Sequence, residues 1–233
     1  DATFDKHSIA FKPTGARLGA LQVQPTTVDI AGLDGEDQEM AIDLAIAGPL
    51  REALELLDHD RLALIRRLGI ATATVSGQAA ARVSFRFPLL ADLKIDDVEI
   101  TAKANLEQTA LNGFLLGQDV RDGRLSLVLD KAGMQITGPV TLGGVGIELD
   151  WKEAFTDTAP YRTDLAAQVP QLDETERKRF GLDLAPYLEG PVSAAVRMLT
   201  DHTGTSTLSA AVNLRTAALA VAPLGWQKPP GNP

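Results

Sequence analysis

Apolar and polar side chains alternate along much of the chain, most clearly over residues 71–87. The odd positions there hold Ala, Val, Gly and Phe, whereas the even positions are polar except for Ala80. A period of two places the two sets on opposite faces of an extended strand. Such a strand would run roughly 55 Å, and Gly77 predicts a bulge along it.

The same alternation predicts a series of further strands. They are expected at 98–106, 125–129, 134–142, 145–151, 192–198 and 208–214. Turn-forming residues separate several of them, at 122–123, 131–133, 143–144 and 202–204. Short connections join antiparallel neighbours, so we expect hairpins arranged as a meander.

Helical spacing occurs at two places. Pro49 suits the first position of a helix, and Leu50, Leu54 and Leu57 follow on one stripe, with a continuation expected through residues 62–68. The second helix is expected to begin at a capping box and to end at a glycine. These residues are Asp173, Glu176 and Gly181.

Two parts of the chain carry the same landmarks in the same order. The matching segments are 43–45 with 164–166, 66–70 with 178–182, and 102–106 with 210–214. We therefore predict an internal duplication within 1–233, with a first unit at 40–160 and a partial second unit at 161–231. Repeated units of this size usually stack and build one elongated surface rather than a single pocket.

The predicted sheet has an apolar face that two short helices cannot cover. It can fold over as a sandwich, close as a barrel, or curl into a trough filled by another molecule such as acyl chains. Sandwiches are the commoner solution, but the small aliphatic side chains of this face favour the trough. We expect a mainly β fold: an elongated, curved antiparallel sheet forming an open groove with two short helical insertions. A closed β sandwich is the alternative.

Composition narrows the classes of function. The net charge of -9 argues against nucleic-acid binding, which needs a basic face. The absence of cysteine excludes a disulfide framework and thiolate metal sites. No run of about 18 apolar residues is present. Because the chain begins at Asp1 rather than Met, we expect a fragment of a longer protein, with any membrane anchor outside it.

A set of short motifs resembles one family. They are GPLREAL at 48–54, LGI at 68–70, VSG at 75–77, RFPLL at 86–90, LGG at 142–144, LDW at 149–151, GPV at 190–192 and LGWQKPPG at 224–231. In this order they resemble the central region of AsmA-like proteins of the YhdP type, from Gram-negative bacteria, which are related to TamB-like proteins. The resemblance covers roughly residues 38–231.

The resemblance implies a function in the cell envelope. Proteins of this family are anchored in the inner membrane, extend through the periplasm, and present a β groove with an apolar lumen thought to conduct phospholipid toward the outer membrane. It therefore implies a non-enzymatic segment of a bridge-like phospholipid-transport protein, with no cofactor. The alternative is a structural β module of an envelope assembly protein, and protein partners are not indicated.

The candidate lipid-contacting residues lie on the apolar face of the predicted strands. They are Val83, Phe85, Val98, Ile100, Ala102, Leu106, Leu125, Leu127, Met134, Ile136, Val196 and Leu208. A charged residue at position 100 or 127 is expected to block lipid contact while leaving the sheet formed. Burial of each methylene contributes about 0.8 kcal/mol, so a modest length of contact suffices.

No catalytic or metal-binding constellation is expected. His7, His59 and His202 are far apart and lack ligand partners at helical or hairpin spacing. The carboxylates Asp92, Asp96 and Asp97 are interpreted as a solvated loop cluster. The basic pairs at 66–67 and 178–179 suit helix C-termini, and a contact with lipid headgroups at the groove rim is the alternative.

Overall fold

The computed structural model describes residues 2–12, 15–35, 37–57, 72–94, 97–115 and 117–232. The first half contains β1 (Ala2–Phe4), β2 (Ser8–Phe11), β3 (Ala16–Leu18), β4 (Leu21–Ala31), β5 (Glu39–Pro49), α1 (Leu50–Leu57), the 3-10 helix η1 (Thr72–Thr74), β6 (Val75–Pro88) and β7 (Glu99–Leu115). The second half contains β8 (Gln118–Leu129), β9 (Gly133–Leu142), β10 (Val145–Ala154), β11 (Thr163–Leu172), α3 (Glu174–Arg179), β12 (Leu188–Glu189), β13 (Val192–Thr200), β14 (Ser206–Asn213), β15 (Ala218–Val221), η3 (Ala222–Leu224) and β16 (Trp226–Lys228).

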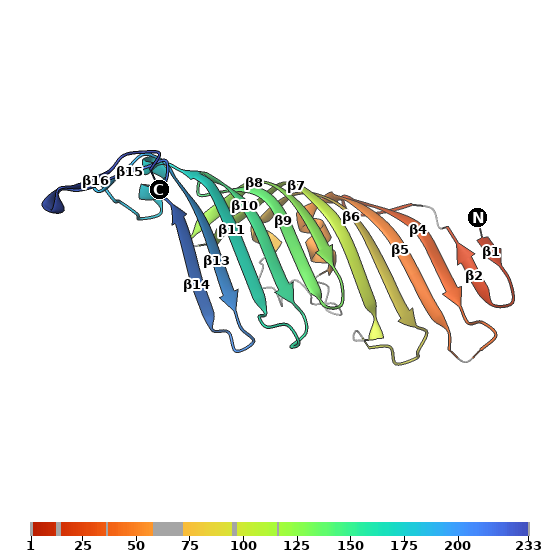
Figure 1. Ribbon diagram of the computed structural model, residues 1–233. Coiled ribbons are helices and arrows are strands. Elements are labelled where there is room, and N and C mark those ends of the chain that lie inside the picture. The colour runs from red at the N-terminus through yellow and green to blue at the C-terminus, as the bar shows by residue number, and fades with distance from the viewer. Residues whose placement is uncertain are drawn as a thin grey trace.

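One 13-stranded antiparallel sheet dominates the molecule. Its strands follow chain order from β1 to β14, with β3 beside β4 and β12 outside it, because β12, β15 and β16 form a separate small sheet. The large sheet is elongated, and β1 and β14 lie at its opposite ends (Figure 1). These two strands do not pair, so the described part of the sheet is open and neither a barrel nor a closed sandwich. The predicted mainly β, curved open fold is confirmed.

Both predicted helices are present. The α1 helix begins at Leu50, one residue after the predicted start, because Pro49 is still the last residue of β5. The expected continuation through 62–68 lies outside the described residues. At α3, Asp173 accepts a hydrogen bond from the Glu176 N–H, and the Glu176 carboxylate accepts one from the Asp173 N–H. The predicted capping box is therefore confirmed.

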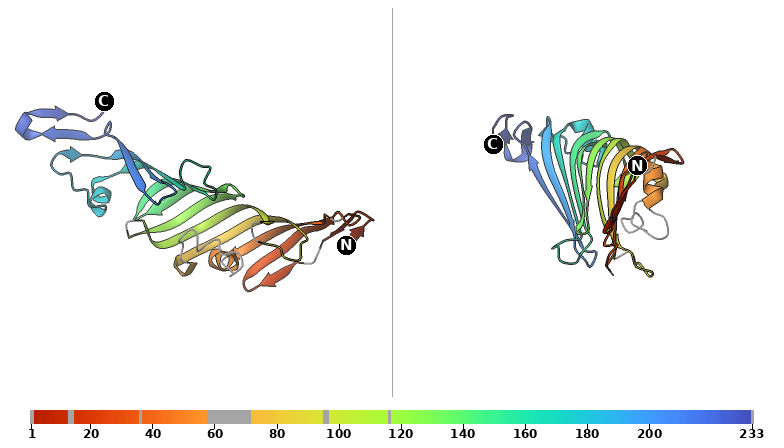
Figure 2. Two further views of the ribbon diagram at one scale, coloured as in Figure 1. Left: turned by 90° about the horizontal axis from the view of Figure 1, so that it is seen from below. Right: turned by 90° about the vertical axis from the view of Figure 1, so that its right-hand side faces the viewer.

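The sheet is irregular along a line that crosses β6 to β9. The bulge predicted at Gly77 is confirmed, since the β6–β7 register shifts there. The predicted turn at Asp122 is wrong: this residue lies inside β8, at a register shift and with a positive φ of 53°. The aspartate–glycine pair serves a bulge here rather than a turn, because both features need the same left-handed backbone. Aligned bulges bend and twist a sheet, as Figure 2 shows.

The two helices leave the sheet on the same side. The α1 helix follows the strand end at Pro49, and α3 follows the strand end at Leu172. The pairing registers place both ends level with the β9–β10 turn at Leu142. We call this the helix side of the sheet, and the side with the strand ends at Pro88 and Thr200 the open side.

Only part of the strand pairing is the same in the two units of the predicted duplication: Leu44 pairs with Val83, whereas the matching Leu165 pairs with Met198, two residues further along. On the following strand pair the register is the same: residues 81–83 (ARV) match 194–196 (AAV) in the sequence, Val83 pairs with Ala102, and Val196 pairs with Ala210. In both, the strand before the inserted helix pairs with the next strand of the large sheet, β5 with β6 and β11 with β13, although β12 of the small sheet lies between β11 and β13 in the sequence. The duplication, with units at 40–160 and 161–231, therefore stays a prediction.

Candidate functional site

A single row of apolar side chains crosses the large sheet perpendicular to its strands. Each member is the direct cross-strand partner of the next, from β4 to β14. We call it the central row: Val23, Ile46, Ala81, Ala104, Leu127, Ile136, Trp151, Leu165, Met198 and Leu208. At roughly 4.8 Å between neighbouring strands, it runs about 40 Å. No charged side chain interrupts it.

Most of the central row is only half-buried. Ile136 and Leu165 are buried, at 8% and 9% exposure, but the other members from Val23 to Met198 retain partial solvent access. At the β14 end, Leu208 is 70% exposed. An apolar row under a second protein layer would be buried throughout, so this face is covered only in part.

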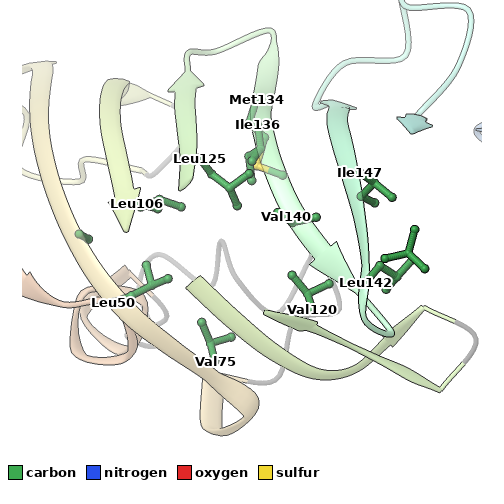
Figure 3. Close-up of a cluster of buried hydrophobic side chains, with 12 residues drawn as sticks. Leu50, Val75, Leu106, Val120, Leu125, Met134, Ile136, Val140, Leu142 and Ile147 are labelled. Atoms are coloured by element: carbon green, nitrogen blue, oxygen red, sulfur yellow. The ribbon is translucent and has the colours of Figure 1, made fainter. Parts of the chain in front are cut away.

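Side chains on the helix side of the central row form a closed core. Leu50 of α1 packs there with Val75, Val120, Leu142 and Val145, each at most 8% exposed. Figure 3 shows Leu50, Val75, Val120 and Leu142 together in one part of this cluster. Phe180, directly after α3, packs against the same cluster. The helix side of the apolar face is therefore covered by protein from β6 to β10, whereas Val212 on β14 is 54% exposed.

On the open side, the row of residues next to the central row is apolar as far as β9 and polar from β10 onward. In the next row, Leu44, Val83, Ala102 and Leu129 are apolar and end at Met134. From β10 onward the same row is polar. Its members are Glu153, Thr163, Thr200 and Ser206. The apolar track is thus bordered by hydrogen-bonding groups on the half of the sheet that ends at β14.

Those polar groups are held in place by short contacts. The Glu153 carboxylate accepts hydrogen bonds from Trp151 Nε1 at 3.3 Å and Thr163 Oγ1 at 2.8 Å. Arg162 Nε lies 3.6 Å from the other carboxylate oxygen. Thr200 and Ser206 hydroxyls lie 2.9 Å apart. This rim therefore presents organised polar atoms beside Trp151 of the central row.

The structure brings the candidate lipid-contacting residues onto one face. The members within strands share the parity of the central row, and Val98 lies one residue before β7. Phe85, Val98, Ile100, Ala102, Leu127 and Val196 are half-buried, and Leu208 is exposed. Five others are packed by protein atoms at 5–8% exposure: Val83, Leu106, Leu125, Met134 and Ile136. A buried side chain offers little surface to a ligand. These five side chains therefore stabilise the packing of the apolar face rather than contact a ligand.

Some members of the central row are absent from the candidate set. Val23 and Ile46 extend the row into β4 and β5, and Trp151 and Met198 connect its middle to β14. The alternation of Ile42, Leu44 and Ile46 is a signal that was available in the sequence. The cross-strand partnerships that make one row of them depend on register, which alternation alone does not fix.

Several carboxylates of the described residues have lowered pKa values because they accept hydrogen bonds. Hydrogen bonds lower the pKa of Asp5, Asp119, Asp164 and Asp201, which keeps these carboxylates ionised. His7 Nδ1 lies 2.6 Å from an Asp34 oxygen at an exposed site. His202 Nε2 lies 2.8 Å from the Ala159 carbonyl, whereas His59 lies outside the described residues. Across the described ranges, no group of three or more His, Asp or Glu is placed to hold a metal.

Comparison with known proteins adds no further constraint. No protein-family model, curated protein or solved structure matches the chain. Within the described residues, no helix is both long and apolar enough to span a membrane.

Proposed function

We propose that this chain is a non-enzymatic segment of a bridge-like phospholipid-transport protein of the Gram-negative envelope. The observation that carries the proposal is the central row, an uncharged apolar track of about 40 Å that is covered on the helix side from β6 to β10 and is half-buried at most of its positions. The periplasmic location and the inner-membrane anchor outside the chain rest on the family resemblance alone.

The proposed mechanism is passive. Acyl chains lie along the central row, where burial of each methylene contributes about 0.8 kcal/mol. The row carries no charged anchor, so neighbouring positions along it have similar affinity and a lipid is free to slide. Headgroups stay at the open side, near Glu153 and Thr163, where polar atoms are already present.

A structural β module is the second candidate. It is favoured by one observation: five of the candidate side chains, including Met134 at 5% exposure, are already packed by protein. If protein atoms also cover the remaining half-buried side chains in solution, the sheet has no surface for lipid and acts as a scaffold.

Lipid extraction and native mass spectrometry of the purified chain separate these candidates. The adjacent residues Leu127 and Val128 lie on opposite faces of β8, half-buried and 48% exposed respectively. We expect Leu127→Asp to lose co-purified phospholipid and Val128→Asp to retain it, with both variants folded by circular dichroism. The pair Ile100→Asp and Thr101→Asp repeats the comparison on β7. A lipid-free wild-type chain that melts cooperatively would favour the scaffold.

A further inference from the structure

The face opposite the central row contains a hollow of about 520 Å³. Two rows of cross-strand partners on β4 to β8 line it, and the central-row residues Ile46, Ala81, Ala104 and Leu127, which lie between these rows, also belong to the lining. One row includes Gln22, Asn105 and Ser126, and the other includes Gln24, Arg82 and Lys103. The volume lies within the range of small-ligand sites, about 300–1,000 Å³.

The floor of the hollow is made of small side chains. Ala45, Ala47 and Ala80 lie at its centre, between longer side chains on β4 and β7. Methyl groups at these positions leave the sheet surface open. The neighbouring amides and the Ser126 hydroxyl supply donors and acceptors around that opening.

The two cations of the hollow face each other. Arg82 pairs directly with Lys103 across the β6–β7 ladder, and both are exposed. Within the described residues, neither side chain has an ion-pair partner. Like charges directly opposite each other destabilise a sheet. A repulsive pair such as Arg82 and Lys103 on an exposed face is typical of a binding site, where an anionic ligand offsets the repulsion.

The nearest carboxylates on this face are engaged elsewhere or lie outside the lining. Asp43, on the row beyond Arg82, accepts hydrogen bonds from Thr27 Oγ1 at 3.1 Å and from the Ser84 hydroxyl. Glu107 follows Lys103 by four residues and is not part of the lining. The lining residues contain two cations and no carboxylate, in a chain whose net charge is -9. The local electrostatic potential of the hollow therefore favours the binding of anions.

We propose that this hollow binds a phosphate group carried on a small hydroxylated body. The Arg82 guanidinium offers a planar fork for two phosphate oxygens, and Lys103 adds a second positive charge beside it. The amides and the hydroxyl suit hydroxyl groups of the attached body, and the alanine floor gives it room. The phosphate belongs either to a soluble ester or to a lipid headgroup. The cations and amides of the hollow lie on the face opposite the central-row side chains, so the proposal does not rest on acyl-chain binding along the central row.

Titration calorimetry at low ionic strength tests the proposal with two probes, glycerol 3-phosphate and vesicles of phosphatidylglycerol. We expect Arg82→Gln and Lys103→Gln to weaken binding roughly tenfold or more, since each removes a charge-assisted contact. Ala80→Trp, which fills the floor and keeps both cations, should weaken binding as well. Arg86→Gln is the matched control, because Arg86 is exposed on the same strand and face but outside the lining.

The two probes assign the source of the phosphate. Binding of the soluble ester indicates a small-molecule site, and binding of vesicles alone indicates a headgroup site; either supports the proposal if Arg82→Gln abolishes it and Arg86→Gln does not. Leu208→Asp, on the apolar face, must leave this binding unchanged while removing acyl-chain contact. Failure of both probes to bind the wild-type chain, or an equal loss in Arg86→Gln, would overturn the proposal.

Discussion

Arg82 and Lys103 lie directly opposite each other on adjacent central strands, with no counter-ion among the described residues. This cationic pair opposes folding, because like charges repel across a ladder. Lys103→Glu converts it into an attractive pair. We expect that variant to gain about 0.2–1 kcal/mol in the free energy of unfolding, measured by urea denaturation. Lys103→Gln, which only removes the repulsion, should fall between the two. A less stable Lys103→Glu chain would contradict the assigned pairing.

A second prediction concerns Arg177, which is 2% exposed. Its Nη1 donates hydrogen bonds to the Leu172 carbonyl at 3.1 Å and the Gly190 carbonyl at 2.8 Å, so it ties α3 to the chain on both sides. Arg177→Met keeps the length but leaves these acceptors unpaired, at a cost of about 1–3 kcal/mol for each buried carbonyl. Arg179→Met, on the exposed face of α3, is the control. Equal unfolding midpoints for both variants would show that Arg177 does not hold α3.

The pH dependence of stability follows from Asp164 and Arg197. The guanidinium donates two hydrogen bonds to the carboxylate, at 2.8 and 2.7 Å, and they lower the pKa of Asp164 below its ordinary value of 3.8. A lowered folded-state pKa contributes stability above the unfolded value, and that contribution is lost as the pH falls through the folded value. Asp164→Asn should therefore cost about 1 kcal/mol at pH 7.

The difference in the free energy of unfolding between wild type and Asp164→Asn should disappear at acid pH. Below about pH 4 the carboxylate takes up a proton in the unfolded chain first, and the contribution is lost as the pH falls through the lower folded-state pKa, so the unfolding free energies of wild type and Asp164→Asn converge. The exposed turn residue Asp92 supplies the control substitution Asp92→Asn. A gap between wild type and Asp164→Asn that stays constant from pH 7 to pH 3 would rule out this ion pair as its source.

Two glycines give a matched test of the sheet's irregular line. A Cβ on Gly138 would lie 2.2 Å from the Arg124 carbonyl oxygen, at a φ of 139°. A Cβ on Gly146, on the neighbouring strand β10, would meet nothing within 4 Å. We expect Gly138→Ala to cost about 2 kcal/mol or more and Gly146→Ala to change stability little. Similar melting temperatures for the two variants would contradict the close approach of β9 to β8.

Much of the fold could be predicted from the sequence because period-two alternation is a local signal. It identified strands such as β6 and β9, and the capping box at Asp173 located α3. The local sequence signals failed at Asp122, because a left-handed backbone conformation suits both a turn and a bulge within a strand. The Asp122 backbone suits a turn, but tertiary pairing with the bulged β7 makes it an interruption within β8.

The sequence predicts on which face of the sheet the candidate residues lie, but not how deeply each side chain is buried. Alternation places Met134 and Leu208 on the same side of the sheet, yet their exposures are 5% and 70%. Met134 packs within the buried cluster, whereas Leu208 lies on β14, the last strand of the large sheet, and neither position is encoded in the strand pattern itself. The pairing of Arg82 with Lys103 likewise needs the register, because the two are distant in sequence.

The most direct test of the central claim is photocrosslinking from adjacent positions on β14. Leu208 lies on the central row and Ser209 on the opposite face, and both are exposed. A photoreactive residue is placed at each position in turn, the chain is produced in the periplasm of a Gram-negative host, and adducts are identified by mass spectrometry. Phospholipid adducts from position 208 and not from position 209 are the predicted result. Equal adducts from both positions, or none from position 208, would contradict acyl-chain binding along the central row.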